Sequence, residues 1–137
     1  MAAGEYQLAL EAYYRAGLEH GLNADVLSAI GSADLKLGRL NEAERALRAA
    51  LRLNATFVPA LNNLGVVLMN EGRYPEAKEV FQRAFALDSG QSDLIRRNLR
   101  LALAMMDNSG YDPQQKSDFS LMRRGNGEYL LLQTKRG

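Results

Sequence analysis

Few residues in this chain could do acid–base or metal chemistry. It contains one histidine, His20, and no cysteine. A general base needs a positioned partner, and a metal site needs several ligands. The sequence offers no second histidine and no thiolate to complete either kind of site. We therefore interpret His20 as a solvated residue in the loop after the first helix, and we expect no catalytic residue, no metal site and no cofactor.

Two other segments carry residues that are common in functional sites. Asp34 falls in a predicted helix at a position where the later segment has the apolar Leu68. It could be a carboxylate in a binding groove, or a paired polar residue at a contact between helices, and we favour the second interpretation. The segment Arg124-Gly125-Asn126-Gly127 lacks the Lys-Ser/Thr of a phosphate-binding loop and is interpreted as a hairpin turn.

The composition describes a helical protein without an obvious polyanionic partner. The length of 137 residues predicts one domain or one short repeat array. The net charge of +1 gives no reason to expect a general affinity for nucleic acid. Its arginines are few and are not interleaved with aromatic residues, which also argues against RNA binding. No apolar run approaches the ~20 residues that a membrane span needs, and the first residues do not have the pattern of a signal peptide.

The elements that must position any site are set by an internal repeat. The chain matches itself at a shift of 34 residues, and large residues recur with large and small with small. A fixed period of this length indicates stacked helical hairpins. The matching positions are Gly4/Gly38/Gly72, Tyr6/Leu40/Tyr74, Ala9/Ala43/Ala77, Tyr13/Leu47/Phe81, Ala16/Ala50/Ala84 and Ile30-Gly31/Leu64-Gly65.

The recurring small residues have physical reasons. Gly38 and Gly72 fall between helical stretches, where a tight turn favours a residue that tolerates positive φ. Gly31 and Gly65 fall inside helices, where glycine costs about 1 kcal/mol relative to alanine. We therefore expect a neighbouring helix to approach closely at both positions.

This pattern resembles that of the tetratricopeptide repeat (TPR) family over about residues 4 to 91. The resemblance implies an all-α superhelix, a right-handed solenoid of helix hairpins. Two features depart from the family pattern: Leu27 and Leu61 replace the usual bulky aromatic, and Ala55 and Ser89 replace the usual proline. The matching residues are Ile30-Gly31, Gly38-Arg39-Leu40, Glu42-Ala43 and Ala50, and again Leu64-Gly65, Gly72-Arg73-Tyr74, Glu76-Ala77, Phe81 and Ala84.

The repeat divides the chain into five segments. Asn23 is expected to cap the helix from Ala24, and Pro59 suits the first turn of another helix. The last helix carries Asn98-Leu99 where a repeat would have Leu-Gly, as expected for a capping helix. The predicted segments are 1–22 (second helix of a truncated repeat), 24–57 and 58–91 (TPR repeats), 92–107 (capping helix) and 108–137 (linker and a short β-hairpin-like tail).

The truncated repeat predicts an apolar seam that lacks cover. Its residues are Leu8, Ala9, Ala12 and Tyr13. Because about three repeats are usually needed for stability, we expect this first helix or the tail to support a possible homo-oligomer.

In the TPR family, first helices line a concave surface that takes extended peptides or partner helices. Paired asparagines there could satisfy a bound peptide backbone, and arginines could hold a carboxylate or merely keep the cap soluble. The set lacks the Lys and Asn of the carboxylate clamp that binds chaperone C-termini, because serines stand at those places. The groove residues implied are Ser28, Ser32, Leu35, Asn62, Asn63, Val66, Met69, Arg96, Arg97 and Arg100, beside Asp25, Lys36 and Asn70.

A narrower resemblance is to the TPR protein of the Tad (tight adherence, Flp pilus) assembly system. It depends on the short array, Asn98-Leu99, and the tail from Asp118-Phe119 through Arg123-Arg124-Gly125 to Tyr129-Leu130. It implies a bacterial lipoprotein in pilus assembly and secretion, in the periplasm or at the outer membrane; otherwise a cytoplasmic protein is expected. The lipid-bearing cysteine of such proteins is missing from this sequence.

The sequence thus predicts a non-catalytic scaffold for protein–protein interaction. Its expected partner is a protein or peptide, and neither a nucleic acid nor a small-molecule substrate. The alternative is a self-assembly module joined through the tail or the exposed first helix.

Overall fold

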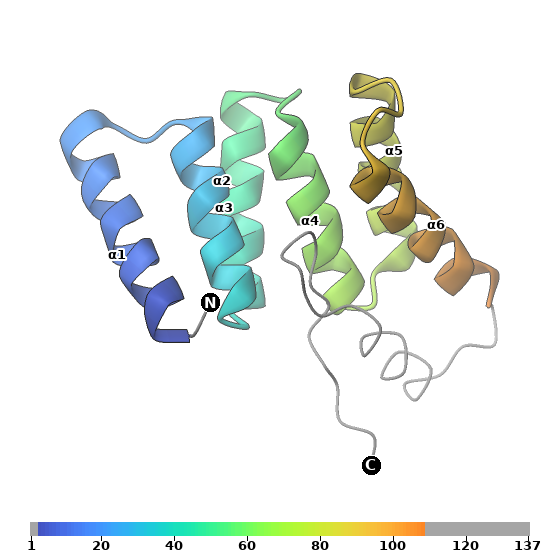
Figure 1. Cartoon of the computed structure of the whole chain (residues 1–137), viewed down its shortest axis with the longest axis horizontal. Coiled ribbons are helices and arrows are strands. Elements are labelled where there is room, and N and C mark those ends of the chain that lie inside the picture. The colour runs from blue at the N-terminus through green and yellow to red at the C-terminus, as the bar shows by residue number, and fades with distance from the viewer. Residues whose placement is uncertain (1–2, 109–137) are drawn as a thin grey trace, which may run out of the picture. The chain divides into compact units, whose positions relative to one another are not determined.

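The computed structural model describes residues 3–108, which form six α-helices and no β-strand (Figure 1). This confirms the predicted all-α class and is consistent with a TPR helical solenoid. The predicted hairpin-like tail lies outside the described residues from residue 109 onward. The helices are α1 (Ala3–His20), α2 (Ala24–Lys36), α3 (Leu40–Leu53), α4 (Val58–Asn70), α5 (Tyr74–Leu87) and α6 (Asp93–Asp107).

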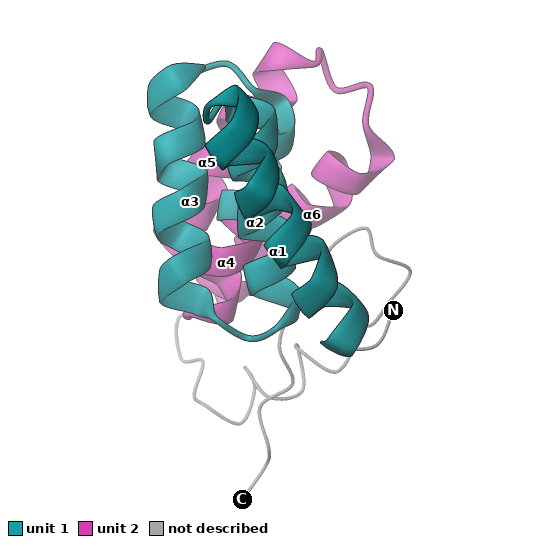
Figure 2. Cartoon of the chain, turned by 90° about the vertical axis from the view of Figure 1, so that its left-hand side faces the viewer, with its two compact units in different colours: residues 1–64 teal, residues 65–137 magenta. Residues whose placement is uncertain are grey.

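The chain divides into two compact units, residues 1–64 and residues 65–137, which Figure 2 colours separately. In the first unit, α2 packs against both α1 and α3. The contact between α1 and α2 is built on buried Leu10, Ile30 and Ala33, with Tyr13 and Val26 packed against them. Burying these side chains is the main force that holds a short helix pair together.

A tight turn built on glycine joins α2 to α3. Gly38 has φ 81°, its N–H donates to the Leu35 carbonyl at 3.0 Å, and the Arg39 N–H donates to the Asp34 carbonyl at 2.8 Å. The same two hydrogen bonds recur 34 residues later, where Gly72 has φ 76°. The turn predicted at these glycines is confirmed, because only glycine adopts positive φ without strain.

Inside each hairpin, a glycine on the first helix faces a large side chain on the second. A Cβ added to Gly31 would lie 2.8 Å from Leu47 Cδ2 and 3.3 Å from the carbonyl of Ala43. In the second unit, a Cβ on Gly65 would lie 2.6 Å from Phe81 Cζ. The predicted close approach of the paired helices is confirmed at both glycines.

The ends of the helices follow their capping residues. Asn23 Oδ1 accepts a hydrogen bond from the Val26 N–H at 2.8 Å, and Ser92 Oγ accepts one from the Ile95 N–H at 3.2 Å. Pro59 lies in the first turn of α4, where its missing N–H is not needed. The predicted start of α2 at Ala24 is confirmed, and α6 begins at Asp93.

In the second unit, α6 packs against α5 along one face. Asn98, which stands where the repeat has Leu64, is buried in this face. Arg100, on another face of α6, is exposed, which agrees with a helix that has one apolar and one polar side. The buried side chains are Tyr74, Ala77, Val80, Phe81 and Ala84 of α5, and Ile95, Asn98, Ala102 and Met105 of α6. The division into repeats and a cap stays a prediction.

The predicted position of His20 in a loop is wrong. It is the last residue of α1 and not a loop residue, because the chain leaves the helix one residue later, at Gly21 with φ 86°. Its side chain is exposed and lies 3.5 Å from Glu19.

Candidate functional site

The groove residues predicted on α2 differ in how accessible they are. Ser28 and Leu35 are buried, whereas Ser32 is half-buried and lines a hollow of about 280 Å³ between α1 and α2. Tyr6 and Tyr13 of α1 line the same hollow, which also contains Lys36. The hollow therefore combines a hydroxyl, two aromatic rings and a cation on the surface of one unit.

One contact organises the rim of this hollow. The Nζ atom of Lys36 lies 5.3 Å from the centroid of the Tyr6 ring, within reach of a cation–π interaction. We did not predict Tyr6 as a site residue. Its match to Tyr74 in the repeat indicated a structural role, but Tyr74 is buried whereas Tyr6 is only half-buried.

The predicted groove residues on α4 are mostly buried. Asn62, Val66 and Met69 have almost no exposed surface, and Asn63 is half-buried. Asn62 Nδ2 donates a hydrogen bond to Asn63 Oδ1 at 3.4 Å, and the side-chain amide of Asn70 donates one to the Val66 carbonyl at 2.9 Å. Of these residues, Asn63 is the one that a partner can reach without a rearrangement of the helix.

The three predicted arginines of α6 also have different environments. Arg96 donates to the carbonyl of Gly90 and to the carboxylate of Asp93, so it holds the first turn of its own helix. Arg97 is half-buried and Arg100 is exposed. Sequence spacing placed these residues on one helix, but it did not show that a backbone carbonyl engages Arg96.

Asp34 does not share a face of α2 with Ser28 and Ser32. It lies seven residues after Leu27 and four residues after Ile30, and this helical spacing puts the three residues on a different side of the helix. Its side chain is only 2% exposed, and its nearest cation is Arg39, with Nη1 3.9 Å from Oδ1. Burial raises the pKa of the Asp34 carboxyl, while Arg39 lowers it and Glu42 raises it further.

The described residues offer no metal centre. Between residues 3 and 108 there is no group of three histidine, cysteine, aspartate or glutamate side chains that could hold an ion. In the same range, no helix has the length and apolar character needed to cross a membrane. The chemistry available at these surfaces is hydrogen bonding, aromatic and apolar contact, and charge pairing.

The tetratricopeptide repeat family model matches residues 28–92, from the middle of α2 to the residue before α6. The match supports the resemblance of this chain to the tetratricopeptide repeat family. TPR domains generally mediate protein–protein interaction and are typically non-catalytic. The two glycine turns and both glycine-facing contacts described above lie inside the matched segment.

Several known proteins are similar to this chain. Cellulose synthase 1 operon protein C of Komagataeibacter xylinus is 38% identical over 80 residues, which is 58% of this chain and 6% of that protein. Another cellulose synthase operon protein C from the same species is 36% identical over the same share of each chain. Small glutamine-rich tetratricopeptide repeat-containing protein 2 of Mycosarcoma maydis is 28% identical over 110 residues, 80% of this chain and 31% of that protein. This chain therefore spans less than a third of the length of each of these relatives.

Proposed function

We propose that this chain is a non-catalytic scaffold that binds a peptide or a partner protein through the surfaces of its first helices. The observation that carries the proposal is the hollow between α1 and α2. There Ser32 offers a hydroxyl, and Tyr6, Tyr13 and Lys36 offer aromatic surface and a positive charge. Tyrosine beside adaptable polar groups is the composition that protein interfaces favour.

The accessible members of the predicted set are the direct contacts in this proposal. They are Ser32, Asn63, Arg97 and Arg100, each at least partly exposed. The buried members support the helix surface from beneath, since a partner cannot touch them directly. These are Ser28, Leu35, Asn62, Val66 and Met69.

The variant that tests the hollow is Ser32→Arg, which places a long charged side chain where a partner would sit. We expect it to lower partner capture by at least about tenfold, because one lost well-packed contact costs about 1.4 kcal/mol or more. Capture is measured by quantitative mass spectrometry after pull-down from cells that encode the chain. The matched control is Arg52→Ala on α3, an exposed residue outside the hollow, which should capture as the wild type does.

Circular dichroism of both variants must first show that their helicity equals that of the wild type. Equal capture by wild type and Ser32→Arg would refute binding at the hollow. Replacing Asn62 or Arg96 is a poorer test, because Asn62 is buried and Arg96 holds the start of α6.

Within this function, we propose assembly of a pilus or secretion system as the biological role. Its support is the resemblance to the Tad TPR protein carried by the short array and Asn98-Leu99. The names of the similar proteins connect related segments to a cellulose synthase operon. If a pilus or secretion component is captured by the wild-type chain and not by Ser32→Arg, the result supports this role. If the protein lost is a component of cellulose synthesis, the pilus role is wrong and a role in cellulose synthesis takes its place.

Self-assembly is the second candidate, and one observation favours it. Leu8 on α1 is 66% exposed and Ala12 is exposed, whereas Ala9 and Tyr13 of the predicted seam are half-buried beside α2. Sedimentation at high concentration, with and without residues 108–137, separates the candidates. A monomer in both cases excludes self-assembly through either segment.

A further inference from the structure

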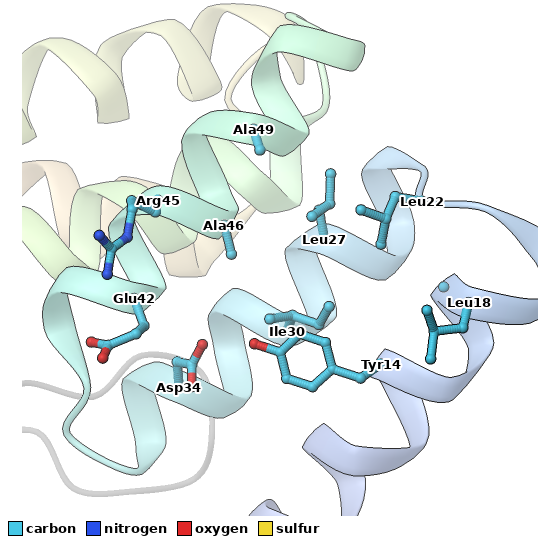
Figure 3. Close-up of a pocket in the computed structure, with 11 residues that line it drawn as sticks. Tyr14, Leu18, Leu22, Leu27, Ile30, Asp34, Glu42, Arg45, Ala46 and Ala49 are labelled. Atoms are coloured by element: carbon cyan, nitrogen blue, oxygen red, sulfur yellow. The ribbon is translucent and has the colours of Figure 1, made fainter.

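A second and larger concavity lies in the first unit, away from the hollow described above. It is a pocket of about 610 Å³ to which α1, α2 and α3 all contribute (Figure 3). Leu18 and Leu22 line it on the side of α1, Leu27 and Ile30 on α2, and Ala46 on α3. Its volume lies within the range of pockets that bind ligands in proteins.

The side chains at the mouth of this pocket are apolar and unusually exposed. Leu18 is 87% exposed, and Tyr14 and Leu22 are each more than half exposed. Tyr14 and Leu18 are four residues apart, so they lie on one face of α1, and Figure 3 shows the Tyr14 ring extending toward Ile30. A continuous apolar surface of this kind on a soluble domain marks a place where another molecule docks.

A buried carboxylate lies at the same pocket. Asp34 is 2% exposed, and no residue between 3 and 108 donates a hydrogen bond to its carboxylate. Arg39 is the nearest cation, but 3.9 Å is longer than a hydrogen bond, and its other terminal nitrogen donates to Gln7 Oε1 at 3.0 Å. A buried carboxylate without donors is costly, since it loses water and gains little in exchange.

The repeat shows that the fold does not require an acid here. The equivalent residue one repeat later is Leu68, which is fully buried. Asp34 also lies in the last turn of α2, where the helix dipole disfavours a negative charge. A residue that opposes both burial and the helix dipole is expected at a functional position.

We propose that this pocket docks an amphipathic helix of a partner protein, whose leucine-like side chains fill the pocket while a lysine or arginine beside them reaches Asp34. Charge decides the occupant, because Asp34 and Glu42 outnumber Arg45 among the charged lining residues. A cation on the incoming helix supplies the hydrogen-bond donor that Arg39, at 3.9 Å, does not. Helices flank the pocket on both sides, which matches the way a helix seats in a groove.

The same geometry sets the pH dependence of docking. Because the pKa of Asp34 is raised, its carboxyl group in the empty pocket holds a proton more tightly than a solvated aspartate does. A cation on an incoming helix favours the ionised form of this carboxyl group. Docking therefore releases protons and strengthens as pH rises through the pKa of Asp34. The other titratable or charged groups around it are Arg39, Glu42, Arg45 and Tyr14.

The test uses a synthetic helix of about four turns, held helical by a side-chain bridge, with leucines along one face and one lysine at the end of the leucine row. A matched peptide has norleucine in place of the lysine. We expect the lysine peptide to bind the wild-type chain at least about tenfold tighter, measured by calorimetry. Asp34→Asn, which keeps the shape, and Asp34→Leu, which copies Leu68, should both abolish that difference.

Two surface variants locate the binding. Leu18→Ser should weaken both peptides, whereas Leu53→Ser, at another exposed leucine outside the pocket, should weaken neither. Ser32→Arg should also leave peptide binding unchanged, so failure of the hollow and failure of the pocket give different results. Equal binding of the two peptides, or no binding of either, overturns the proposal. Hexylammonium binding as tightly as the lysine peptide also overturns it, because the occupant would then be a small amphiphile.

Discussion

Phe81→Ala is expected to lower the free energy of unfolding of this protein by about 3–5 kcal/mol. The side chain is 1% exposed and its ring occupies the space that a Cβ on Gly65 would need. Removing the ring leaves a cavity that the short helices cannot close, because both remain tied by the turn at Gly72. Urea denaturation followed by circular dichroism measures the change.

The partner of that contact gives a sharper test, because two effects of known sign oppose each other there. Gly65→Ala improves helix propensity by about 1 kcal/mol, yet its Cβ would lie 2.6 Å from Phe81 Cζ. The ring is buried and cannot turn away, so we expect a net loss of about 1–3 kcal/mol. Gly4→Ala is the matched control, since nothing lies within 4 Å of that position, and it should be neutral or stabilising.

A gain in stability for Gly65→Ala would contradict close packing of α4 against α5. A loss for Gly4→Ala of similar size would show that the effect belongs to the helix and not to the contact. The two results together separate backbone propensity from packing.

Asp34 gives the second large effect, and here a substitution should stabilise. Asp34→Leu is expected to raise the free energy of unfolding at neutral pH by about 1 kcal/mol or more, because it replaces a desolvated charge by an apolar group. The repeat already accepts leucine at the equivalent position 68. Asp34→Asn removes the charge while keeping the shape, and it should stabilise in the same direction.

The pH dependence of this gain follows from the direction of the pKa shift. The pKa of Asp34 is raised in the folded chain above the 3.8 of a solvated aspartate, so the folded state holds the proton more tightly than the unfolded state. Its contribution to stability is therefore largest below pH 3.8 and is lost as pH rises through the folded-state pKa. The advantage of Asp34→Asn over wild type should vanish in acid and reach its full value at neutral pH.

Comparing the two proteins at each pH cancels the titration of the other carboxyl groups. An advantage for Asp34→Asn that stays constant from acid to neutral pH would contradict the raised pKa. A loss of stability at neutral pH would show that the ion pair with Arg39 outweighs the burial of the charge.

The sequence predicted the parts of this fold that depend on local chemistry. Gly38 predicted its turn because positive φ is a property of one residue, and Asn23 predicted its cap for a similar reason. Gly31 predicted the approach of α3 because an interior glycine is costly unless a neighbour requires it. Each of these needs only the repeat and the properties of single residues.

The candidate site was less predictable, because accessibility depends on residues far apart in the chain. Periodicity placed Val66 and Met69 on a helix face, but it did not show that they would be buried. Nor did it show that Arg39 would divide its guanidinium between Asp34 and Gln7, which is 32 residues away. The pocket at Asp34 was missed for the same reason, although the replacement of leucine by aspartate in the repeat was visible.

The proposed function requires that the helix surfaces of this chain bind a protein directly. Photo-crosslinking in cells that encode the chain tests it most directly, with a benzophenone amino acid at Ser32, at Asn63 or at the control position Arg52. The account predicts a discrete crosslinked protein at Ser32 and Asn63 and none at Arg52, which is exposed but lies outside the proposed contacts. Crosslinks of equal yield at all three positions, or none at Ser32 and Asn63, would contradict it.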